Sequence, residues 1–354
     1  PERGSLPDDP LAIPFGTSFS DHMLLMDWTE KSGWNDPRIV PFGPFNMHPA
    51  STILHYGQEV FEGMKAHTTV DGRTTIFRPD KNMERMHNSC ERLCLPTIPH
   101  DVGIHLIDEL IRVDHQFVPK VRGASLYIRP TVIGVEPCLG VKPAGHVLFF
   151  IIMCPVGSYY GGTGIKPIKI WICDKYTRAA PLGIGEAKTA GNYAASLKGG
   201  QEALKYGCQQ AMWLDGAEHK YVEEVGAMNM FFVFKRGNGV ELVTPELNGS
   251  ILPGVTRDSI IQLAPSLGED WSMTVRKLPL EELLRGVEDG TCVEAFGAGT
   301  AAVVAPVSHF HWQGKDYQVG NGDVGDVAQT IYGRLQEFYY GSGKDDRGWV
   351  HEVK

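Results

Sequence analysis

Hydrophobic and polar residues follow two different periods along the chain, and each period predicts a different kind of element. Apolar residues recur at helical spacing over residues 82–95, 104–118 and 194–206, which predicts three helices. A further helix is predicted to begin at Thr256. Short runs rich in β-branched and aromatic residues predict strands at RIVPF, TTIFR, SLYIRPTVIG, HVLFFIIMCPVG, IKIWIC, QAMWLDG and MNMFFVF. HVLFFIIMCPVG is so apolar that we expect both of its faces to be buried.

Helical and strand-like segments are mixed throughout the chain without an internal repeat, which predicts a fold of the α/β (α+β) class. The glycine-rich stretch SYYGGTGIKP interrupts this order near the middle of the sequence. We therefore predict a smaller N-terminal domain over residues 1–158, an interdomain loop over 159–166 and a larger domain over 167–354. A length of 354 residues agrees with this division, since domains contain roughly 150 residues each.

Charge and hydropathy exclude several classes of protein. The 33 Lys and Arg residues against 42 Asp and Glu give a net charge of −9, which argues against nucleic acid or an anionic membrane as the main partner. The longest apolar run, residues 147–154, is too short to span a bilayer. The first residues, PERGSLPDDP, resemble neither a secretion signal nor a transit helix, so we expect a cytoplasmic protein.

The seven cysteines predict no disulfide framework, because their number is odd and no pair is spaced C-x-x-C. We expect reduced, buried thiols. No cluster of Cys and His has the spacing of a zinc site, so we expect no metal.

Lys188 lies in the segment GIGEAKTAGNY, where small residues surround the lysine on both sides. Such a segment occurs where the backbone is tightly packed or where a large group must come close. Two interpretations stay open at this point. Lys188 is an exposed loop lysine, or it is an amine in a pocket of low polarity that forms a Schiff base.

The segment YVEEVGAMN leads into the apolar strand MFFVF, which places Glu223 and Glu224 at the start of a buried strand. A carboxylate there is costly unless a cation pairs with it, and a protonated pyridine nitrogen would be such a cation. The alternative is a solvated turn.

Two further segments expose backbone N–H groups. LPGVTRDS precedes a helix and fits a phosphate site at the helix start, although Thr256 or Asp258 could also be an ordinary N-cap. FGAGTAA combines small residues with the hydroxyl of Thr300, but it also matches the G-x-G-x-x-A pattern of dinucleotide folds. A nicotinamide-dependent oxidoreductase therefore remains an alternative.

Ten segments in one order carry a family resemblance: FGTSFSDHM, LHYGQEVFEGMK, FRPDKNMERM, SLYIRP, EPCLGV, PVGSYYGG, AKTAGNY, EEVGAMN, LPGVTRDS and FGAGTAA. The chain resembles the class IV (fold type IV) pyridoxal-phosphate aminotransferases, and among them the branched-chain amino acid aminotransferases. The resemblance implies two domains, a smaller N-terminal α/β domain and a larger, barrel-like α/β domain.

The resemblance implies a set of residues that bind pyridoxal 5′-phosphate. Lys188 matches the lysine that forms the Schiff base and shuttles the proton. Glu224, rather than Glu223, matches the acid facing the pyridine nitrogen, and Tyr193 matches the tyrosine bonded to the ring 3′ oxygen. The implied phosphate ligands are Arg85, Val255, Thr256 and Thr300.

The resemblance also implies an aromatic substrate pocket and a homodimer. Leu139 and Val141 match a loop that reaches the pocket of the partner subunit. Arg129 is expected near the rim of the pocket, and the N–H groups of Thr300 and Ala301 are expected to bind the substrate carboxylate. The aromatic residues implied around the pocket are Phe15, Tyr56, Phe61 and Tyr159, and Tyr127 is expected with Arg129 on the side of the substrate carboxylate.

The implied activity is ping-pong transamination of L-leucine, L-isoleucine and L-valine with 2-oxoglutarate, and the sequence does not rank the three amino acids. Ala302 and Ala305 stand where some relatives carry a redox-active thiol pair, and Ala227 stands where some carry threonine. D-amino-acid transaminase and aminodeoxychorismate lyase are the alternatives within the superfamily. The segments FGTSFSDHM and LHYGQEVFEG favour the branched-chain enzymes.

Overall fold

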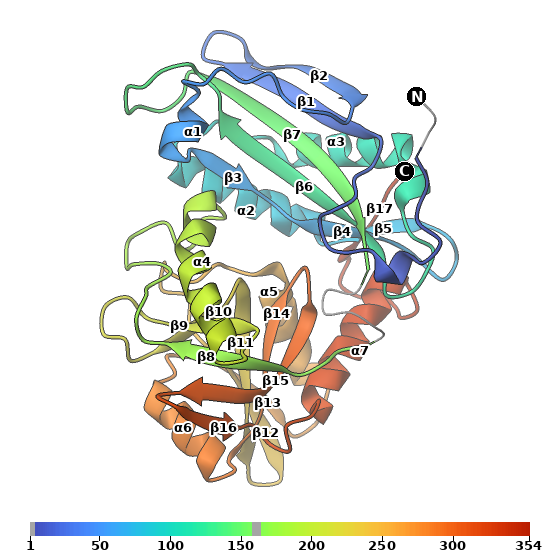
Figure 1. Ribbon diagram of the computed structural model, residues 1–354. Helices are drawn as coiled ribbons and strands as arrows, with labels where there is room; N and C mark the ends of the chain where they lie inside the picture. The colour runs from blue at the N-terminus through green and yellow to red at the C-terminus, as the bar shows by residue number, and fades with distance from the viewer. Residues whose placement is uncertain (1–3, 158–163) are drawn as a thin grey trace. The chain divides into compact units, whose positions relative to one another are not determined.

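A computed structural model describes residues 4–157 and 164–354 (Figure 1). The chain divides into two compact units. Unit 1 contains Pro1–Gly164, Ala187–Ala190 and Gln336–Lys354, and unit 2 contains Ile165–Glu186 and Gly191–Leu335. The fold is mixed α/β with one large sheet in each unit, which confirms the predicted fold class.

Unit 1 is built on an antiparallel sheet in the order β17-β5-β4-β6-β7-β1-β2, with β3 paired to β6. Its strands are β1 (His22–Thr29), β2 (Gly33–Pro41), β3 (Glu59–Phe61), β4 (Met64–Thr68), β5 (Thr74–Phe77), β6 (Ser125–Gly134), β7 (His146–Val156) and β17 (Val350–Glu352). Its helices are α1 (Thr52–Tyr56), α2 (Pro79–Arg92) and α3 (His100–Val113), with 3₁₀ turns at Pro10–Ala12 and His115–Phe117.

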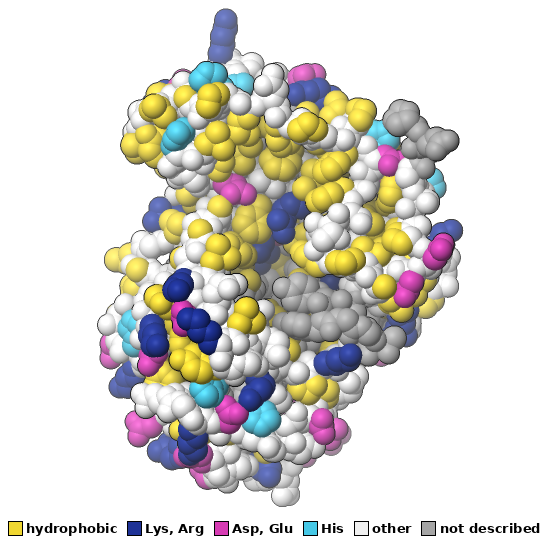
Figure 2. Space-filling model, viewed as in Figure 1, with side chains coloured by type: hydrophobic (Ala, Val, Ile, Leu, Met, Phe, Trp, Pro, Cys, Tyr) yellow, Lys and Arg dark blue, Asp and Glu magenta, His cyan; other side chains and the backbone are white. Residues whose placement is uncertain are grey.

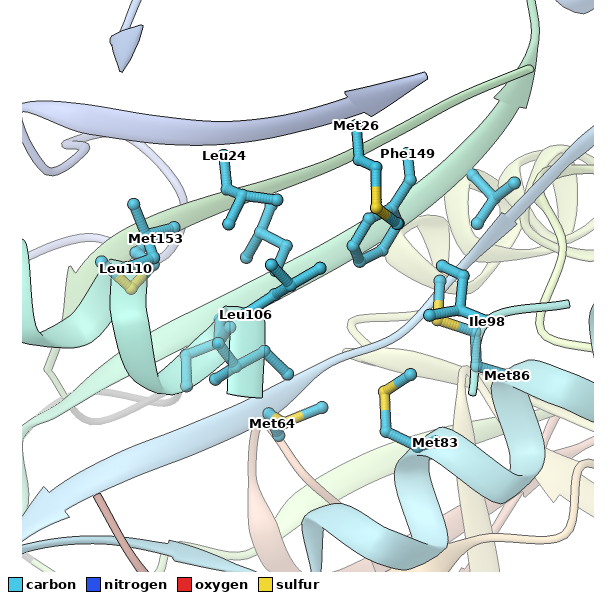
Figure 3. Packing of buried hydrophobic residues seen from close by; sticks show 14 of the residues in the cluster. Leu24, Met26, Met64, Met83, Met86, Ile98, Leu106, Leu110, Phe149 and Met153 are labelled. Carbon is cyan, nitrogen blue, oxygen red and sulfur yellow. The ribbon is translucent and has the colours of Figure 1, made fainter. Parts of the chain in front are cut away.

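The core of unit 1 lies between one face of this sheet and the helices α2 and α3. Figure 3 shows side chains of the strands and of both helices meeting in this layer. Several of them are methionines, whose flexible thioethers fill irregular space between a sheet and crossing helices. The labelled members of the core are Leu24, Met26, Met64, Met83, Met86, Ile98, Leu106, Leu110, Phe149 and Met153.

The opposite face of the unit 1 sheet carries polar and aromatic side chains. Alternate residues of a strand point to opposite faces, so the register Lys65↔Tyr127↔Cys154 sets these three side chains on the face away from the core. Along most of β7 buried and half-buried residues alternate, so the expectation that both its faces are buried is wrong. Apolarity alone did not distinguish a strand with one covered face from a strand with two.

Unit 2 contains a closed, barrel-like sheet. The order is β10-β9-β8-β15-β14-β11-β12-β13, and β10 also pairs with β11, which closes a ring of six strands. The strands are β8 (Ile168–Cys173), β9 (Gln210–Leu214), β10 (Val222–Val225), β11 (Met228–Arg236), β12 (Gly239–Thr244), β13 (Trp271–Val275), β14 (Cys292–Gly299), β15 (Val303–Trp312) and β16 (Lys315–Gln318). The helices are α4 (Ala190–Lys205), α5 (Val255–Leu263) and α6 (Leu280–Glu288), with a 3₁₀ turn at Ala264–Ser266. A further helix, α7 (Asp326–Tyr340), begins in unit 2, and its residues from Gln336 onward belong to unit 1.

The two units differ from the predicted division in two places. The sequence assigned all of residues 167–354 to the second domain, whereas Gln336–Lys354 belongs to unit 1, because β17 pairs with β5 and Tyr339 stacks on His67. Ala187–Ala190 also belongs to unit 1. Residues 158–163 of the predicted boundary lie outside the described residues, and the boundary itself stays a prediction.

The predicted helices are confirmed as α2, α3, α4 and α5, with ends shifted by a few residues. α2 begins at Pro79, since proline at a first helical position loses no intrahelical hydrogen bond. The expectation of buried thiols is wrong for Cys94, which is exposed, and for Cys138, which is half-buried. Over the described ranges we find no helix long and apolar enough to cross a membrane. Nor do those ranges contain a group of three or more His, Cys, Asp or Glu residues that could hold a metal ion.

Candidate active site

The backbone of Lys188 is held on both sides within unit 1. Its N–H donates to Ser89 Oγ of α2 at 2.9 Å, and its carbonyl accepts the N–H of Phe61 of β3 at 3.0 Å. Thr189 Oγ1 donates to the carbonyl of Glu59 at 2.6 Å, so both Lys188 and Thr189 are hydrogen-bonded to β3. The side chain is half-buried, with Nζ 5.1 Å from the centre of the Phe61 ring. The interpretation of Lys188 as an exposed loop lysine is therefore wrong.

The small residues before Lys188 pack closely in unit 2. A Cβ at Gly185 would lie 2.3 Å from the carbonyl oxygen of Ser250, and a Cβ at Gly183 would lie 2.9 Å from that of Ala180. Larger side chains would displace this backbone. The tight packing expected around this segment is thus present.

Arg85 is buried in unit 1 and forms an ion pair with Glu62. Its Nε donates to Glu62 Oε1 at 2.7 Å, and its Nη2 donates to Oε2 at 2.9 Å. Asn82, one turn earlier on α2, donates to Oε2 at 2.8 Å. Burial alone would raise the pKa of Glu62, but Arg85, Lys188 and Asn82 together lower it below its ordinary value. The carboxylate is therefore ionised.

The predicted substrate aromatics Phe61, Tyr127 and Phe15 lie together on the outer face of the unit 1 sheet. The Arg129 guanidinium lies 4.7 Å from the centre of the Phe61 ring and 5.2 Å from that of Tyr127, and its Nη2 donates to Tyr127 Oη at 3.0 Å. The Phe15 ring meets Tyr127 edge-on at 4.8 Å. A Cβ at Gly63 would lie 1.9 Å from Tyr127 Oη, so only glycine admits the tyrosine here. The result is an aromatic wall with an arginine on it.

The remaining predicted substrate residues are not part of this group. Tyr56 ends α1 and donates from its hydroxyl to the carbonyl of Leu139. Leu139 and Val141 are 62% and 85% exposed, which is unusual for apolar side chains. Figure 2 shows hydrophobic side chains gathered on the surface of unit 1. Tyr159 lies outside the described residues.

Glu224 of unit 2 lies on a β-hairpin whose register explains the spacing E-x-G-x-x-N. Glu224 pairs with Asn229 and Val225 with Met228, which leaves Gly226 at φ 55° in a two-residue turn. Asn229 Nδ2 donates to Glu224 Oε1 at 3.2 Å, and Arg178 forms an ion pair with Oε2. Glu224 is 2% exposed, so the alternative of a solvated turn is wrong.

Glu223, the neighbouring acid, serves a different part of unit 2. It is also buried, and its Oε1 accepts hydrogen bonds from Ser250 Oγ and from Asn248 Nδ2. Ser250 also receives Arg178 Nη2 at its carbonyl oxygen, at 2.6 Å. Glu223 therefore holds the 248–250 loop, and Glu224 remains the candidate for the cofactor.

The start of α5 follows directly from the same network. Asn229 Nδ2 donates to the carbonyl of Leu252 at 2.9 Å, and the N–H of Leu252 donates to Glu224 Oε1 at 3.2 Å. The N-cap is Gly254, which has no side chain to cap the helix, so Thr256 and Asp258 are not the N-cap. The first N–H groups of the helix, at Val255 and Thr256, form the electropositive end to which anions bind.

Thr300 and Ala301 lie in the turn between β14 and β15, where Gly299 pairs with Val303. The antiparallel return of β15 contradicts the dinucleotide interpretation, because that fold requires a helix after the glycines. Val303 has φ 62°, a rare conformation for a β-branched residue.

Tyr193, on α4, is half-buried.

Sequence reasoning missed Glu62 and Arg178, which pair with two of the predicted residues. Glu62 stands in the quoted motif LHYGQEVFEGMK, and Arg178 stands ten residues before Lys188 in the sequence. The same physical argument could have indicated both residues. A buried charged side chain that is predicted to bind a ligand also needs an oppositely charged residue nearby. The sequence does not reveal which residue supplies it.

Comparison with known proteins identifies relatives over almost the whole chain. Residues 59–310 match the family described as amino-transferase class IV. The branched-chain-amino-acid transaminase 1 of Bacillus subtilis (strain 168) is 46% identical, over 98% of this chain and 95% of its own length. The branched-chain-amino-acid aminotransferase of Mycolicibacterium smegmatis is 42% identical, over 99% of this chain and 95% of its own.

Solved structures are similar over most of the chain as well. The branched-chain amino acid aminotransferase of Escherichia coli has a TM-score of 0.77 at 30% identity and covers 93% of this chain and 99% of that chain. The T.th. branched-chain amino acid aminotransferase with pyridoxamine 5′-phosphate has a TM-score of 0.75 at 28% identity, covering 93% and 98%.

Proposed function

Because the chain belongs to the class IV aminotransferase family, we propose that it transfers the amino group of L-leucine, L-isoleucine or L-valine to 2-oxoglutarate. The family resemblance predicted from the sequence motifs is confirmed. The products are the branched-chain 2-oxo acids and L-glutamate, and the cofactor is pyridoxal 5′-phosphate. The observation that carries the proposal is the Lys188 backbone, held between β3 and α2 beside the buried Arg85.

The chemistry of the predicted residues fits this cofactor. Its phosphate dianion needs cations and N–H donors, which Arg85, the uncapped start of α5 and the hydroxyl of Thr300 supply. Its protonated ring nitrogen needs a carboxylate, which Glu224 supplies, and Tyr193 supplies a hydroxyl for the ring 3′ oxygen. When bound, the cofactor supplies an electron sink at the substrate α-carbon.

Each of these residues has one task. Lys188 Nζ binds the cofactor covalently and carries the proton to and from the substrate α-carbon. Glu224 keeps the ring nitrogen protonated, and the ion pair with Arg178 holds the Glu224 carboxylate in place. Val255 donates its backbone N–H to the phosphate.

The substrate residues divide by the chemistry of the two amino-group donors. Phe15, Phe61, Tyr56 and Tyr159 form an apolar surface for branched side chains, and Tyr127 stands with Arg129 on the carboxylate side. The N–H groups of Thr300 and Ala301 bind the α-carboxylate. Arg129 binds the distal carboxylate of glutamate, since its guanidinium already lies on the rings of Phe61 and Tyr127.

We also propose a homodimer in which Leu139 and Val141 reach the partner subunit. Their exposure supports this, because exposed apolar side chains gathered on one surface are typical of an interface. A cytoplasmic location stays the expectation from the sequence. Leucine, isoleucine and valine remain unranked, and a panel of L- and D-amino acids distinguishes the proposed activity from D-amino-acid transamination and from lyase chemistry.

The role of Lys188 is tested with Lys188→Ala. We expect the parent to be yellow with a visible band that borohydride bleaches, and we expect the variant to lose this band and turnover by roughly 10² to 10⁴-fold or more. Lys198→Ala, which removes an exposed lysine of α4, is the control and keeps both. Normal turnover in Lys188→Ala would contradict the assignment.

The role of Arg129 is tested with Arg129→Ala and paired assays. Activity with glutamate should fall by about tenfold to a hundredfold, since a charge-assisted contact to the distal carboxylate is lost, while activity with leucine falls less. Arg112→Ala, at an exposed arginine of α3, is the control. A larger loss with leucine than with glutamate would show that Arg129 has another role.

A further inference from the structure

Glu62 is a wholly buried carboxylate to which the proposed function gives no task. Its two oxygens accept four hydrogen bonds: two from Arg85 and one each from Asn82 Nδ2 and from the N–H of Gly63, the last at 3.0 Å. A carboxylate with this many donors is both ionised and fixed in orientation.

The pairing with Glu62 sets the orientation of the Arg85 guanidinium. Arg85 donates from Nε and Nη2, which is the side-on arrangement of an arginine and a carboxylate. In this arrangement the Nη1 edge of the planar guanidinium is directed away from Glu62. Since Arg85 is 7% exposed, the pair also balances a charge that would otherwise be costly to bury.

The same segment also fixes Lys188. Glu62 directly follows Phe61, whose N–H donates to the Lys188 carbonyl, and β3 lies beside α2 (Figure 1). On α2, Ser89 accepts the N–H of Lys188 and donates to the carbonyl of Arg85 at 2.8 Å. Glu62, Arg85 and the Lys188 backbone are thus joined through β3 and α2.

We propose that Glu62 is a positioning residue: its carboxylate fixes the orientation in which the Arg85 guanidinium binds the cofactor phosphate. This inference rests on the proposed function.

Two substitutions test this effect. Glu62→Asp keeps the charge but is shorter by one methylene, so it disturbs the geometry of the Arg85 pair. Glu62→Gln keeps the shape but removes the charge. The control is Asp108→Asn, because Asp108 is another buried carboxylate of unit 1 and bonds to His351 rather than to Arg85.

Two dissociation constants are measured for each variant by titrating the apoprotein, one for pyridoxal 5′-phosphate and one for pyridoxal, which lacks the phosphate. Glu62→Asp and Glu62→Gln should each raise the dissociation constant for pyridoxal 5′-phosphate by about tenfold or more, because the Arg85 guanidinium is no longer held side-on, and should leave that for pyridoxal near the parent's. Asp108→Asn should change neither.

Each other outcome has a definite meaning. Parent affinity for pyridoxal 5′-phosphate in both variants overturns the proposal, and so does an equal loss of affinity for pyridoxal, because the defect would then lie outside the phosphate contact. Loss of folding in both variants, with Asp108→Asn folded, would assign Glu62 a purely structural role and overturn the proposal. A parent protein that binds no pyridoxal 5′-phosphate would instead contradict the proposed function.

Discussion

Each unit of the molecule contains a buried glutamate–arginine pair. The proposed cofactor ligand is the arginine in one pair and the glutamate in the other. In unit 1 the arginine, Arg85, is the proposed cofactor ligand and Glu62 supports it. In unit 2 the glutamate, Glu224, is the proposed ligand and Arg178 supports it. An asparagine accompanies each carboxylate, Asn82 in the first pair and Asn229 in the second.

The proposed ligands have opposite charges because the two ends of the cofactor are charged differently. A phosphate requires a cation, and a protonated ring nitrogen requires an anion. Either charge is costly to bury alone, so each ligand needs an opposite charge that stays in the protein when the cofactor leaves. The proposed site therefore includes the partner residues Glu62 and Arg178, although neither is proposed to touch the cofactor.

The largest effect should come from removing a supporting partner. Arg178→Met leaves Glu224 buried without its cation and leaves the Ser250 carbonyl without a donor, so we expect the apoprotein to lose about 3–5 kcal/mol of stability. Denaturant midpoints of the apoprotein measure this without a contribution from bound cofactor.

The double variant Arg178→Met/Glu224→Gln sharpens this test. It removes both charges, so most of the stability should return while transaminase activity remains lost. If the single variant were as stable as the parent, the pair would not be needed to balance a buried charge, and the comparison of the two units would fail.

A smaller effect is expected from Lys65, a half-buried lysine on the outer face of the unit 1 sheet. Burial lowers the pKa of Lys65 to about 8, since a lysine, unlike an arginine, can lose its proton when buried. Between this value and the ordinary value of 10.5 the unfolded chain binds more protons than the folded chain. The contribution of Lys65 to stability therefore rises with pH across this range and is least favourable below pH 8.

Lys65→Met should accordingly be more stable than the parent at pH 7 by about 1–3 kcal/mol, and this advantage should disappear as the pH approaches 10.5. Denaturant midpoints at pH 7 and pH 10 measure it, with Lys198→Met as a control at an exposed lysine. If Lys65→Met were more stable than the parent by the same amount at both pH values, packing rather than the charge of Lys65 would be responsible.

The smallest effect tests the connection between Glu224 and the start of α5. A Cβ at Gly254 would lie 2.0 Å from Asn229 Oδ1, so Gly254→Ala must displace either Asn229 or the helix start. We expect about tenfold weaker binding of pyridoxal 5′-phosphate, because the N–H groups of Val255 and Thr256 move with the helix.

Gly200→Ala is the matched control for this substitution. Gly200 lies in α4, and no atom lies within 4 Å of the position of its Cβ. Alanine there should leave cofactor binding unchanged and stabilise the helix by about 0.5–1 kcal/mol. Equal effects of the two substitutions would show that Gly254 is not required by close packing.

Local patterns predicted many of the elements. The predicted strands SLYIRPTVIG and IKIWIC correspond residue for residue to β6 and β8, because turn residues end both runs sharply. The hairpin that pairs Glu224 with Asn229 needs only the short spacing E-x-G-x-x-N, so it too lies within reach of sequence reasoning. The half-buried face of β7 could not be predicted in this way, because the apolarity of a strand does not show which neighbours cover it.

The sequence by itself determined the fold class, the family and the identity of the candidate ligands, because these depend on short-range patterns and motif order. Only the tertiary structure decided that Gln336–Lys354 and the Lys188 loop belong to unit 1, and that Glu62 pairs with Arg85 and Arg178 with Glu224. The physical reason is that strand pairing and the balance of buried charge join residues far apart in the chain. Their partners are chosen by the folded backbone, and no local pattern records that choice.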